Sequence, residues 1–324
     1  MTVTASGVTT DAAGANRQIG ADGAGSGRKR RGGRPWTHAA LYLFPLPAVV
    51  LYVIFFVVPV VNALQYAGTD WDGFSLDYQN VGLANLTKLA TNDDLFSNAL
   101  GNNLRFMLVV VMLQTFLSLL LAIFLVKNTR ASIFLRALYF LPTILSSVSV
   151  AFVWRFMYDP NYGLLNKTLE AVGLDGLQSS YLGNSTFAIY WVALTQVWFH
   201  TGQLMVVYIA GLQSIPVELY ESAEMDGASK WQVFRHLTWP MIAPATAIVV
   251  AYTTIQSFKA FDLIVGLGGN PPRQSLDILS TRIYTSFANS EFGYAAAESV
   301  VFMAVIAVVT LAQRWALRTS RKDV

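Results

Sequence analysis

A short polar segment, Glu221-Ser222-Ala223-Glu224-Met225-Asp226-Gly227, lies between two apolar stretches of the chain, and Pro240 follows thirteen residues after Gly227. The chemistry open to these residues is charge pairing and hydrogen bonding with another molecule. A loop between membrane spans needs no helix-forming polar order of this kind unless something docks on it. We therefore interpret the segment as a docking surface for a partner.

Other residue types exclude most catalytic chemistry. The chain has no cysteine, so it can form no disulfide, thiolate metal site or catalytic thiol. His38, His200 and His236 lie far apart and show no metal-ligand spacing. The sequence contains no Gly-x4-Gly-Lys-Ser/Thr phosphate loop, and no Ser/His/Asp or paired-carboxylate set falls at a common depth. We expect no catalytic residue, no metal, no cofactor and no ATP hydrolysis by this chain itself.

The composition is that of a membrane protein. Apolar residues make up 54% of the 324 residues, and charged residues make up 13%, against about 25% in a typical soluble domain. A membrane helix needs about 20 mainly apolar residues. Six stretches meet this requirement, at roughly 39–62, 104–126, 134–158, 187–213, 241–265 and 295–317. The predicted fold class is an all-α membrane protein with six transmembrane helices.

The distribution of charge predicts the orientation of these spans. Six spans place both termini on one side, and that side carries fifteen of the 22 Lys and Arg residues. Acidic residues divide as seven on that side and twelve on the other, so the net charges are +8 and −5. Positively charged loops face the cytoplasm. Both termini are therefore expected inside, in a multi-pass plasma-membrane protein.

The two ends of the chain differ from the apolar region. Residues 1–38 are rich in Gly, Ala, Ser and Thr and end in a basic run, which predicts a disordered cytoplasmic tail. The apolar stretch that follows is too long for a cleaved signal peptide and fits a signal anchor. Binding of the basic run to nucleic acid is the less favoured reading. The predicted organisation is this tail, a six-helix domain at 39–318, and a cytoplasmic C-terminal tail at 319–324.

Two outer segments, roughly 63–103 and 159–186, are long enough to hold short surface helices. Aromatic residues lie at or beyond the outer boundary, among them Tyr66, Trp71, Tyr158 and Tyr181. Anchoring at the membrane interface is the ordinary role of such residues. Contact with a soluble partner is the alternative.

The cytoplasmic loop 214–240 reads as two short helices. Pro216 suits the first turn of the first helix, and Gly227 can close that helix with a positive φ. Ser229 and Gln232 form a capping-box pair for the second helix, and Pro240 marks entry to the fifth span. This arrangement predicts a compact knob below the membrane, with a pair of interfacial helices lying on lipid as the alternative.

This loop resembles a known motif. Its spacing is Glu221-Ser222-Ala223-x3-Gly227-x9-Leu237-x-Trp239-Pro240. That spacing resembles the EAA motif of permease subunits of bacterial ATP-binding-cassette (ABC) importers, Glu-Ala-Ala-x3-Gly-x9-Ile-x-Leu-Pro. Ser222, Leu237 and Trp239 depart from the pattern, but they keep its small or apolar character.

Roughly residues 39–318 resemble the carbohydrate-importer branch, and most of all the first of its two permease subunits. The similar segments are Arg136–Pro142, Val153–Phe156, Asp159–Asn166, Gln256–Ile264 and Phe292–Ala297. Gly268-Gly269-Asn270-Pro271-Pro272 departs from a Gly-Gly-Gly-Pro-like turn that is common in the branch. The resemblance implies a type I ABC importer permease fold.

The resemblance also implies partners and roles. They are a second homologous permease, two ATP-binding subunits, an extracellular solute-binding lipoprotein and a carbohydrate substrate, or a related solute such as glycerol phosphate. The residues implied in coupling to the ATPase are Glu221, Ser222, Ala223, Asp226, Gly227 and Pro240. Glu221 would meet a basic residue of the ATPase, and Gly227 would permit the tight corner.

Polar residues within spans usually face a bundle interior or a cavity. The candidates are Gln114, Gln196, His200, Gln203, Gln256, Lys259 and Asp262, with Phe258 as a ring that could stack on a sugar. From these we assign Gln203, Gln256, Phe258, Lys259 and Asp262 to a substrate path. The ordinary alternatives are hydrogen bonding between helices, aromatic packing, and ion pairs of Lys259 with Asp262 and of Arg155 with Asp159.

Three other functions compete with an ATP-driven permease. A secondary transporter driven by an ion gradient would need an intramembrane carboxylate relay, and Asp262 is the nearest candidate. A membrane enzyme lacks a catalytic constellation, and a structural scaffold would not explain the ordered loop.

Overall fold

The computed structural model describes residues 43–319, and side chains as far as residue 316. The predicted tail at 1–38 and residues 320–324 lie outside the described residues. The chain divides into two units, Met1–Ile54 and Phe55–Val324. The first contributes α2 and the beginning of η1 to the described part, and the second contains all the remaining elements.

The described residues are helical, apart from turns and an isolated bridge between Thr69 and Asn80. The predicted all-α class is therefore confirmed. The α-helices are α2 (Leu46–Tyr52), α3 (Val58–Tyr66), α4 (Ala84–Thr91), α5 (Asp94–Leu125), α6 (Arg130–Phe140), α7 (Ser147–Met157), α8 (Leu164–Ala171), α9 (Ala188–Gln213), α10 (Val217–Met225), α11 (Lys230–Val233), α12 (Trp239–Phe258), α13 (Phe261–Gly268), α14 (Leu279–Ala288) and α15 (Phe292–Thr319). Four short helical turns join them: η1 (Val53–Val57), η2 (Leu141–Ile144), η3 (Asp175–Leu177) and η4 (Phe234–Thr238).

Four helical stretches in the described part are long and apolar enough to cross a membrane: Leu46–Tyr66, Asp94–Leu125, Lys230–Phe258 and Phe292–Ala316. Two bent pairs raise the number to six if each pair is one span. The pairs are Arg130–Ile144 with Ser147–Met157, bent by 98°, and Ala188–Gln213 with Val217–Met225, bent by 66°. By length and composition, the described helices thus allow four to six crossings.

The third stretch predicted at 134–158 is broken near its middle, with a bend of 98° between its two parts. Pro142 has no N–H to donate and clashes with the carbonyl four residues earlier, and the chain tightens into η2. Leu145 is then extended, and the Ser146 hydroxyl accepts from the Ser149 N–H at 3.2 Å to begin α7. The signals were a proline and a serine cap inside an apolar run.

The fifth span also differs from the prediction of 241–265. Its helix ends at Phe258, and α13 starts at Phe261 after a break at Lys259 and Ala260. No proline or glycine marks this break, so sequence rules gave no signal for it.

Two prolines follow π-helical turns. η1 precedes Pro59, η4 precedes Pro240, and each proline is the second residue of the next α-helix. A π turn holds more residues than an α turn, so the carbonyl that would clash with the proline ring is displaced and the helix continues. Pro240 therefore does not open a separate span, because the helix runs from Lys230 through Phe258.

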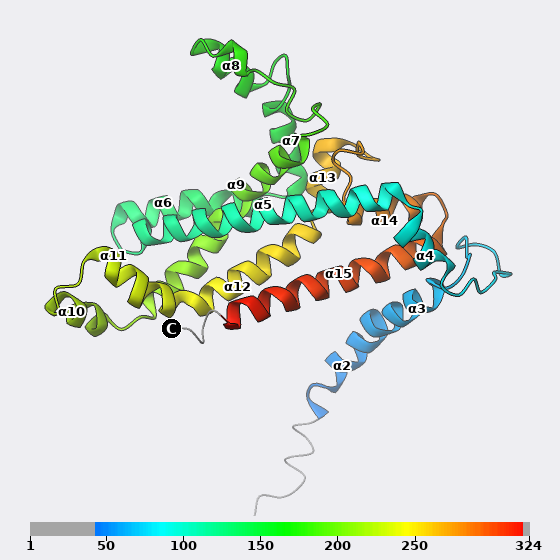
Figure 1. Ribbon diagram of the computed structural model, residues 1–324, viewed down its shortest axis with the longest axis horizontal. Helices are drawn as coiled ribbons and strands as arrows, with labels where there is room; N and C mark the ends of the chain where they lie inside the picture. The colour runs from blue at the N-terminus through cyan, green and yellow to red at the C-terminus, as the bar shows by residue number, and fades with distance from the viewer. Residues whose placement is uncertain (1–42, 320–324) are drawn as a thin grey trace, which may run out of the picture. The chain divides into compact units, whose positions relative to one another are not determined.

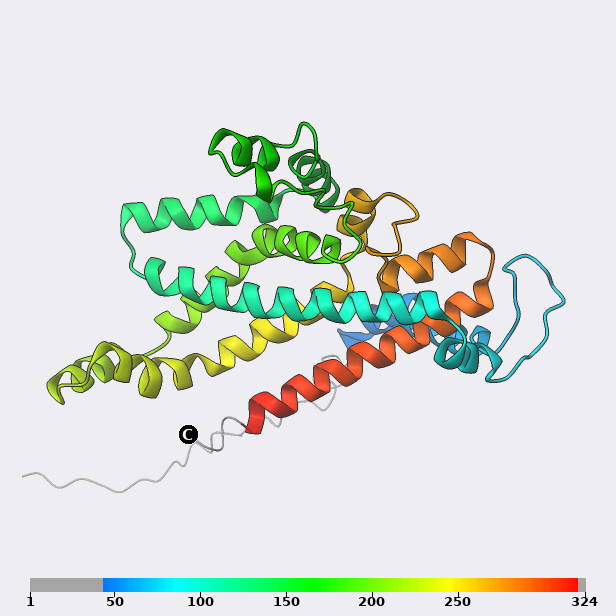
Figure 2. The same ribbon diagram turned by 45° about the horizontal axis from the view of Figure 1, so that its top comes forward.

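The second unit is built around α5, which packs most extensively on α9 and also contacts α12. Figure 1 shows α12 between α5 and α15, and Figure 2 shows the same neighbours after a 45° turn. The α15 helix also packs on α3 and α4. Three clusters of buried apolar side chains lie between these helices.

Contacts between loops group them at two ends of this unit. The Gln213 side chain at the end of α9 donates to the Val126 carbonyl at the end of α5, at 3.3 Å. Toward the other end, Asn102 donates to the Asp277 carbonyl at 3.0 Å, and the Tyr294 hydroxyl donates to Asp93 at 2.5 Å.

Two of the aromatic residues expected at the membrane interface are core residues instead. Tyr158 and Tyr181 are 2% and 4% exposed and belong to the cluster around α9. The Tyr158 hydroxyl donates to the Trp191 carbonyl at 2.8 Å. The expected surface helices do occur in the outer segments, as α4 and α8.

The segment Asp159–Asn166 owes its pattern to a compact turn. Asp159 accepts from the Asn161 and Tyr162 N–H groups at 2.8 and 2.9 Å, and these bonds hold the pKa of Asp159 below its usual value. The buried Asn166 side chain donates to the carbonyls of Pro160 and Ser179, at 2.9 and 3.1 Å. Asp159 therefore serves this turn rather than an ion pair with Arg155.

Gly202 allows α9 to pass close to the backbone of α6, and its replacement tests that packing. A Cβ there would lie 1.9 Å from the Tyr139 carbonyl oxygen, so Gly202→Ala would push α9 away from α6. Overpacking of this kind costs about 1–3 kcal/mol. We expect a lower thermal unfolding midpoint in detergent, followed by tryptophan fluorescence.

Gly101→Ala is the matched control, because no atom lies within 4 Å of a Cβ there. Alanine is a better helix former than glycine by up to about 1 kcal/mol, so this variant should unfold at or above the wild-type temperature. Equal midpoints for the two variants would contradict the close crossing.

Candidate functional site

The polar segment singled out in the sequence forms a helix, a glycine corner and a second helix. Pro216 is the N-cap of α10, with φ −57° and ψ 134°, and so stands one residue before the first turn expected to hold it. The Ser222 hydroxyl donates to the Glu218 carbonyl within α10, at 2.8 Å. The Ser222 hydroxyl is therefore bonded within its own helix.

Gly227 ends α10 as predicted. Its φ is +72°, a left-handed conformation that glycine adopts without the Cβ penalty. The Gly227 N–H donates to the Glu224 carbonyl, and the Ala228 N–H donates to the Ala223 carbonyl, both at 3.0 Å. These two bonds form a complete Schellman motif, in which Asp226 is the C-cap.

Ser229 opens the second helix through the predicted capping box. The Gln232 side chain accepts from the Ser229 N–H at 2.8 Å, and the Ser229 hydroxyl accepts from the Gln232 N–H at 3.4 Å. The helix then continues through η4 into α12 without interruption. The corner at Gly227 thus joins a short helix to one long helix.

A hydrogen bond holds the two helical parts of the segment together, and apolar packing attaches the segment to the rest of the unit. The Tyr220 and Thr238 hydroxyl groups are 3.2 Å apart and tie α10 to η4. Ile215 is buried in the cluster formed by α5, α9 and α12, and Tyr220 packs against that cluster.

The outer surface of the segment combines charge with apolar area. Glu221 is exposed, and among the described residues it has no hydrogen bond or ion pair. Met225 and Trp231 are 88% and 65% exposed. Ala223 and Pro240 are half-buried, so they pack within the segment and contribute little to its exposed surface. The exposed residues can make charge-assisted and apolar contacts with a partner.

The residues assigned to the substrate path differ in burial and in their hydrogen-bond partners. Gln203 donates to the Tyr252 hydroxyl at 3.2 Å, and so links α9 to α12. Gln256 is half-buried, and its side-chain amide oxygen has no partner in the described part. Phe258 is fully buried and meets Phe302 edge-on, with ring centroids 6.0 Å apart.

Lys259 and Asp262 are exposed at the break between α12 and α13. Within residues 43–316 no ion pair joins them, so the pairing that their spacing allowed is not formed. The two residues are free to meet another molecule.

Gln114, a polar residue that the sequence did not assign to the substrate path, is a strong candidate for it in the structure. Its side chain is fully buried in α5, and both amide atoms lack a partner in the described part. The hydroxyl of buried Thr253 in α12 also lacks a hydrogen-bond partner in the described part. A buried polar group without a partner costs about 1–3 kcal/mol, so these groups mark places where water or a solute would be stabilised.

A buried charge cluster was missed by the sequence reasoning. Glu298 in α15 is 0% exposed, and its carboxylate lies 3.5 Å from the Arg282 side chain of α14. The signal was an acidic residue inside the apolar stretch 295–317, where charges are rare and functional.

Asp277 and Asp93 border this cluster outside the spans. Burial raises the pKa of Asp277, although Thr281 and Arg282 act in the opposite direction. Burial alone would also raise the pKa of Asp93, but hydrogen bonds from Tyr294 and the Phe96 N–H outweigh it and hold the pKa below its usual value. The described residues contain no group of three or more His, Asp or Glu that could hold a metal.

An all-helical membrane chain with an ordered polar corner and unpartnered polar groups between its helices has the features of a transport subunit. The family model described as "binding-protein-dependent transport system inner membrane component" matches residues 114–322, and the chain belongs to that family.

Two relatives and one solved structure support this assignment. The chain is 37% identical over 272 residues to a probable ABC transporter permease protein of Pyrococcus horikoshii, over 84% of this chain and 93% of the relative. It is 34% identical over 297 residues to the diacetylchitobiose uptake system permease protein of Streptomyces coelicolor, over 86% of this chain and 84% of the relative. A chain in the crystal structure of a bacterial alginate ABC transporter, in complex with alginate pentasaccharide-bound periplasmic protein, matches with TM-score 0.77. That match covers 89% of this chain and 96% of the other at 23% identity, and it shows a shared fold.

The corner at Gly227 can be tested by its conformation alone, because no atom lies within 4 Å of a Cβ there. Asparagine tolerates the left-handed conformation, whereas β-branched residues do not. We expect Gly227→Asn to keep the corner and Gly227→Val to loosen it. Tryptic cleavage after Lys230 and Arg235 of the detergent-solubilised protein would then be faster in the valine variant only. Equal cleavage of both variants would contradict the role of Gly227.

Proposed function

We propose that this chain is the membrane-spanning permease subunit of an ATP-driven ABC importer and forms half of its translocation path. The family match and the names of the relatives support this role. Two of the proteins reported above carry the names of a diacetylchitobiose system and an alginate system. The proposed substrate class is therefore a di- or oligosaccharide, with a related solute such as glycerol phosphate as the nearest variant.

The 214–240 segment is the proposed docking site for an ATP-binding subunit. The observation that carries this proposal is that the segment is ordered by its own caps, while Glu221, Met225 and Trp231 are exposed on it. A segment that is well ordered, but whose exposed side chains contact nothing else in the chain, suits a surface that fits into a partner's groove. Glu221 would pair with a basic residue there, and ATP hydrolysis would belong to that partner.

Transport then requires two states of the permease pair. A ligand shifts such an equilibrium only by its different affinities for the two states. ATP, acting through the docked subunits, and the loaded extracellular lipoprotein must therefore both favour the outward-open state. The second permease, two ATP-binding subunits and the lipoprotein are the proposed partners.

The proposed topology has six crossings with both termini in the cytoplasm of a bacterial cell. It counts each bent pair as one span, and the charge count supports its orientation. The docking segment and the turn between α5 and α6 then lie together on the cytoplasmic side.

The first experiment separates ATP from ion gradients as the energy source. We expect uptake of radiolabelled diacetylchitobiose or another disaccharide by cells that express the whole system to stop when arsenate depletes ATP. A protonophore should leave it largely intact. Glu298, a buried carboxylate in α15, is a group that an ion-driven transporter would use, so the opposite pattern would favour that alternative.

Glu221→Lys should abolish this uptake while the protein remains in the membrane, because it places like charges across the docking contact. Asp77→Lys is the matched control, since Asp77 is an exposed carboxylate of an outer loop. Uptake should survive in the control. Normal uptake by Glu221→Lys would refute the docking assignment.

The proposed substrate path comprises Gln203, Gln256, Phe258, Lys259 and Asp262, and Gln114 joins it on the evidence of its unpartnered amide. Alanine at Gln203, Gln256 and Phe258 together should lower the uptake rate tenfold or more. Gln65→Ala, an exposed glutamine of α3, should leave it unchanged. Since Phe258 also packs against Phe302, the pair Gln203→Ala and Gln256→Ala is measured separately, and unchanged transport in both sets would refute the path.

A further inference from the structure

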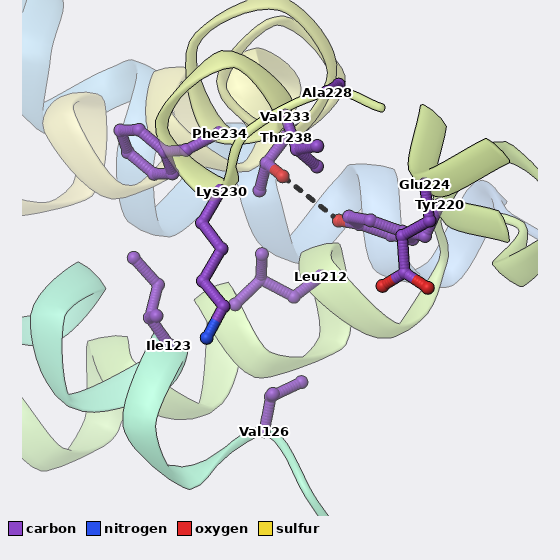
Figure 3. Close-up of a pocket in the computed structure, with 10 residues that line it drawn as sticks. All are labelled: Ile123, Val126, Leu212, Tyr220, Glu224, Ala228, Lys230, Val233, Phe234 and Thr238. Carbon is purple, nitrogen blue, oxygen red and sulfur yellow. Dashed lines mark hydrogen bonds between the residues drawn. The ribbon is translucent and has the colours of Figure 1, made fainter. Parts of the chain in front are cut away.

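A cavity of about 520 Å³ lies where the docking segment meets the ends of α5 and α9. Figure 3 shows its walls, which come from α5, α9, α10, α11 and η4. Most of the lining is apolar, from Ile123, Val126, Leu212, Val233 and Phe234. This volume falls within the range of small-molecule pockets.

Two opposite charges border the cavity without neutralising each other. Lys230 and Glu224 both line it, both are exposed, and in the described part neither side chain has a hydrogen bond or ion pair. Figure 3 shows the Lys230 side chain extending past Leu212, with the Glu224 carboxylate on the other side, next to Tyr220. The Tyr220 and Thr238 hydroxyl groups bond to each other. The two charges are therefore the polar groups left for an occupant.

The cavity lies at the ends of apolar helices. Val126 is the C-cap of α5, a candidate span, and Leu212 stands in the last turn of α9. In a membrane this is the depth at which hydrocarbon gives way to lipid headgroups. An occupant at this depth can be amphiphilic, with apolar atoms against the wall and charges at the rim.

We propose that this cavity binds the headgroup of an aminophospholipid, with Lys230 on the phosphate and Glu224 on the ammonium group. A purely anionic headgroup would satisfy Lys230 but would face the Glu224 carboxylate. A purely cationic amphiphile would have the reverse conflict. A headgroup that carries both charges pairs both side chains, while the apolar wall receives the first methylene groups of its acyl chains.

Such a lipid would brace the docking segment. It would connect Glu224 before the Gly227 corner with Lys230 after it, and both with the ends of α5 and α9. Its effect on transport rests on the proposed function, whereas its binding does not. The test therefore measures binding by the permease alone.

The experiment uses the purified full-length chain in detergent, with phosphatidylethanolamine, phosphatidylcholine and phosphatidylglycerol added in equal amounts. Retained lipid is counted by native mass spectrometry. We expect the wild type to retain phosphatidylethanolamine at least threefold over each of the others. The methylated ammonium of phosphatidylcholine cannot donate a hydrogen bond to Glu224, and phosphatidylglycerol has no ammonium group.

Charge variants then identify the site. Glu224→Lys leaves two cations at the rim and should reverse the preference toward phosphatidylglycerol. Lys230→Glu should lose retention of all three lipids, and the double swap should restore phosphatidylethanolamine. Glu218→Lys, on the same helix but not part of the cavity lining, should behave as the wild type. Variants are compared only where their thermal unfolding midpoint equals that of the wild type.

Equal retention of the three lipids by the wild type would overturn the proposal. So would an unchanged preference in Glu224→Lys, or the same change in Glu218→Lys. Displacement of all lipid when the cognate ATP-binding subunit is added would assign the cavity to that subunit instead. Loss of uptake in Glu221→Lys with lipid preference intact would separate failure of docking from failure of lipid binding.

Discussion

The constraint on which this structure depends is that a chain in hydrocarbon must satisfy its own backbone polar groups. At the end of α5 and at the Gly227 corner, other groups of the same chain take over the unused donors and acceptors of the helix. At the turn after α5, the Arg136 guanidinium donates to the carbonyls of Leu125 and Lys127 and to the Asn128 side chain. At the docking corner, the Schellman motif and the capping box do the same with backbone and side-chain groups. The order of that corner thus comes from its own residues, and it is what makes the corner usable by a partner.

The sequence allowed the class of fold and much of the docking corner to be predicted. Helix capping depends on a few neighbouring residues, so Gly227, Ser229 and Gln232 could be assigned from spacing alone, and each has the expected role. Long apolar runs likewise located α9 and α15 closely. These features are local, and local rules describe them well.

Features set by contacts between distant segments were not predictable in the same way. The break after Phe258 has no proline or glycine, so it depends on the packing of α12 and α13 against other helices. The burial of Tyr158 and Tyr181 depends on where the outer loop folds back onto α9. The Arg282–Glu298 pair joins residues of two helices, and its only local sign was a carboxylate in an apolar run. Position along the chain says little about such pairs, because helix packing decides them.

The unbroken helix from Lys230 to Phe258 has a mechanical consequence. At 1.5 Å per residue, its 29 residues form a rod of about 43 Å. One end carries the capping box beside the Gly227 corner, and the other carries Gln256 and Phe258. A tilt of about 10° about the corner would sweep the far end through about 7 Å, following from the same rise per residue. Because the helix continues past Pro240 after the π turn at η4, a displacement applied at its Lys230 end would be carried along the helix toward Gln256 and Phe258.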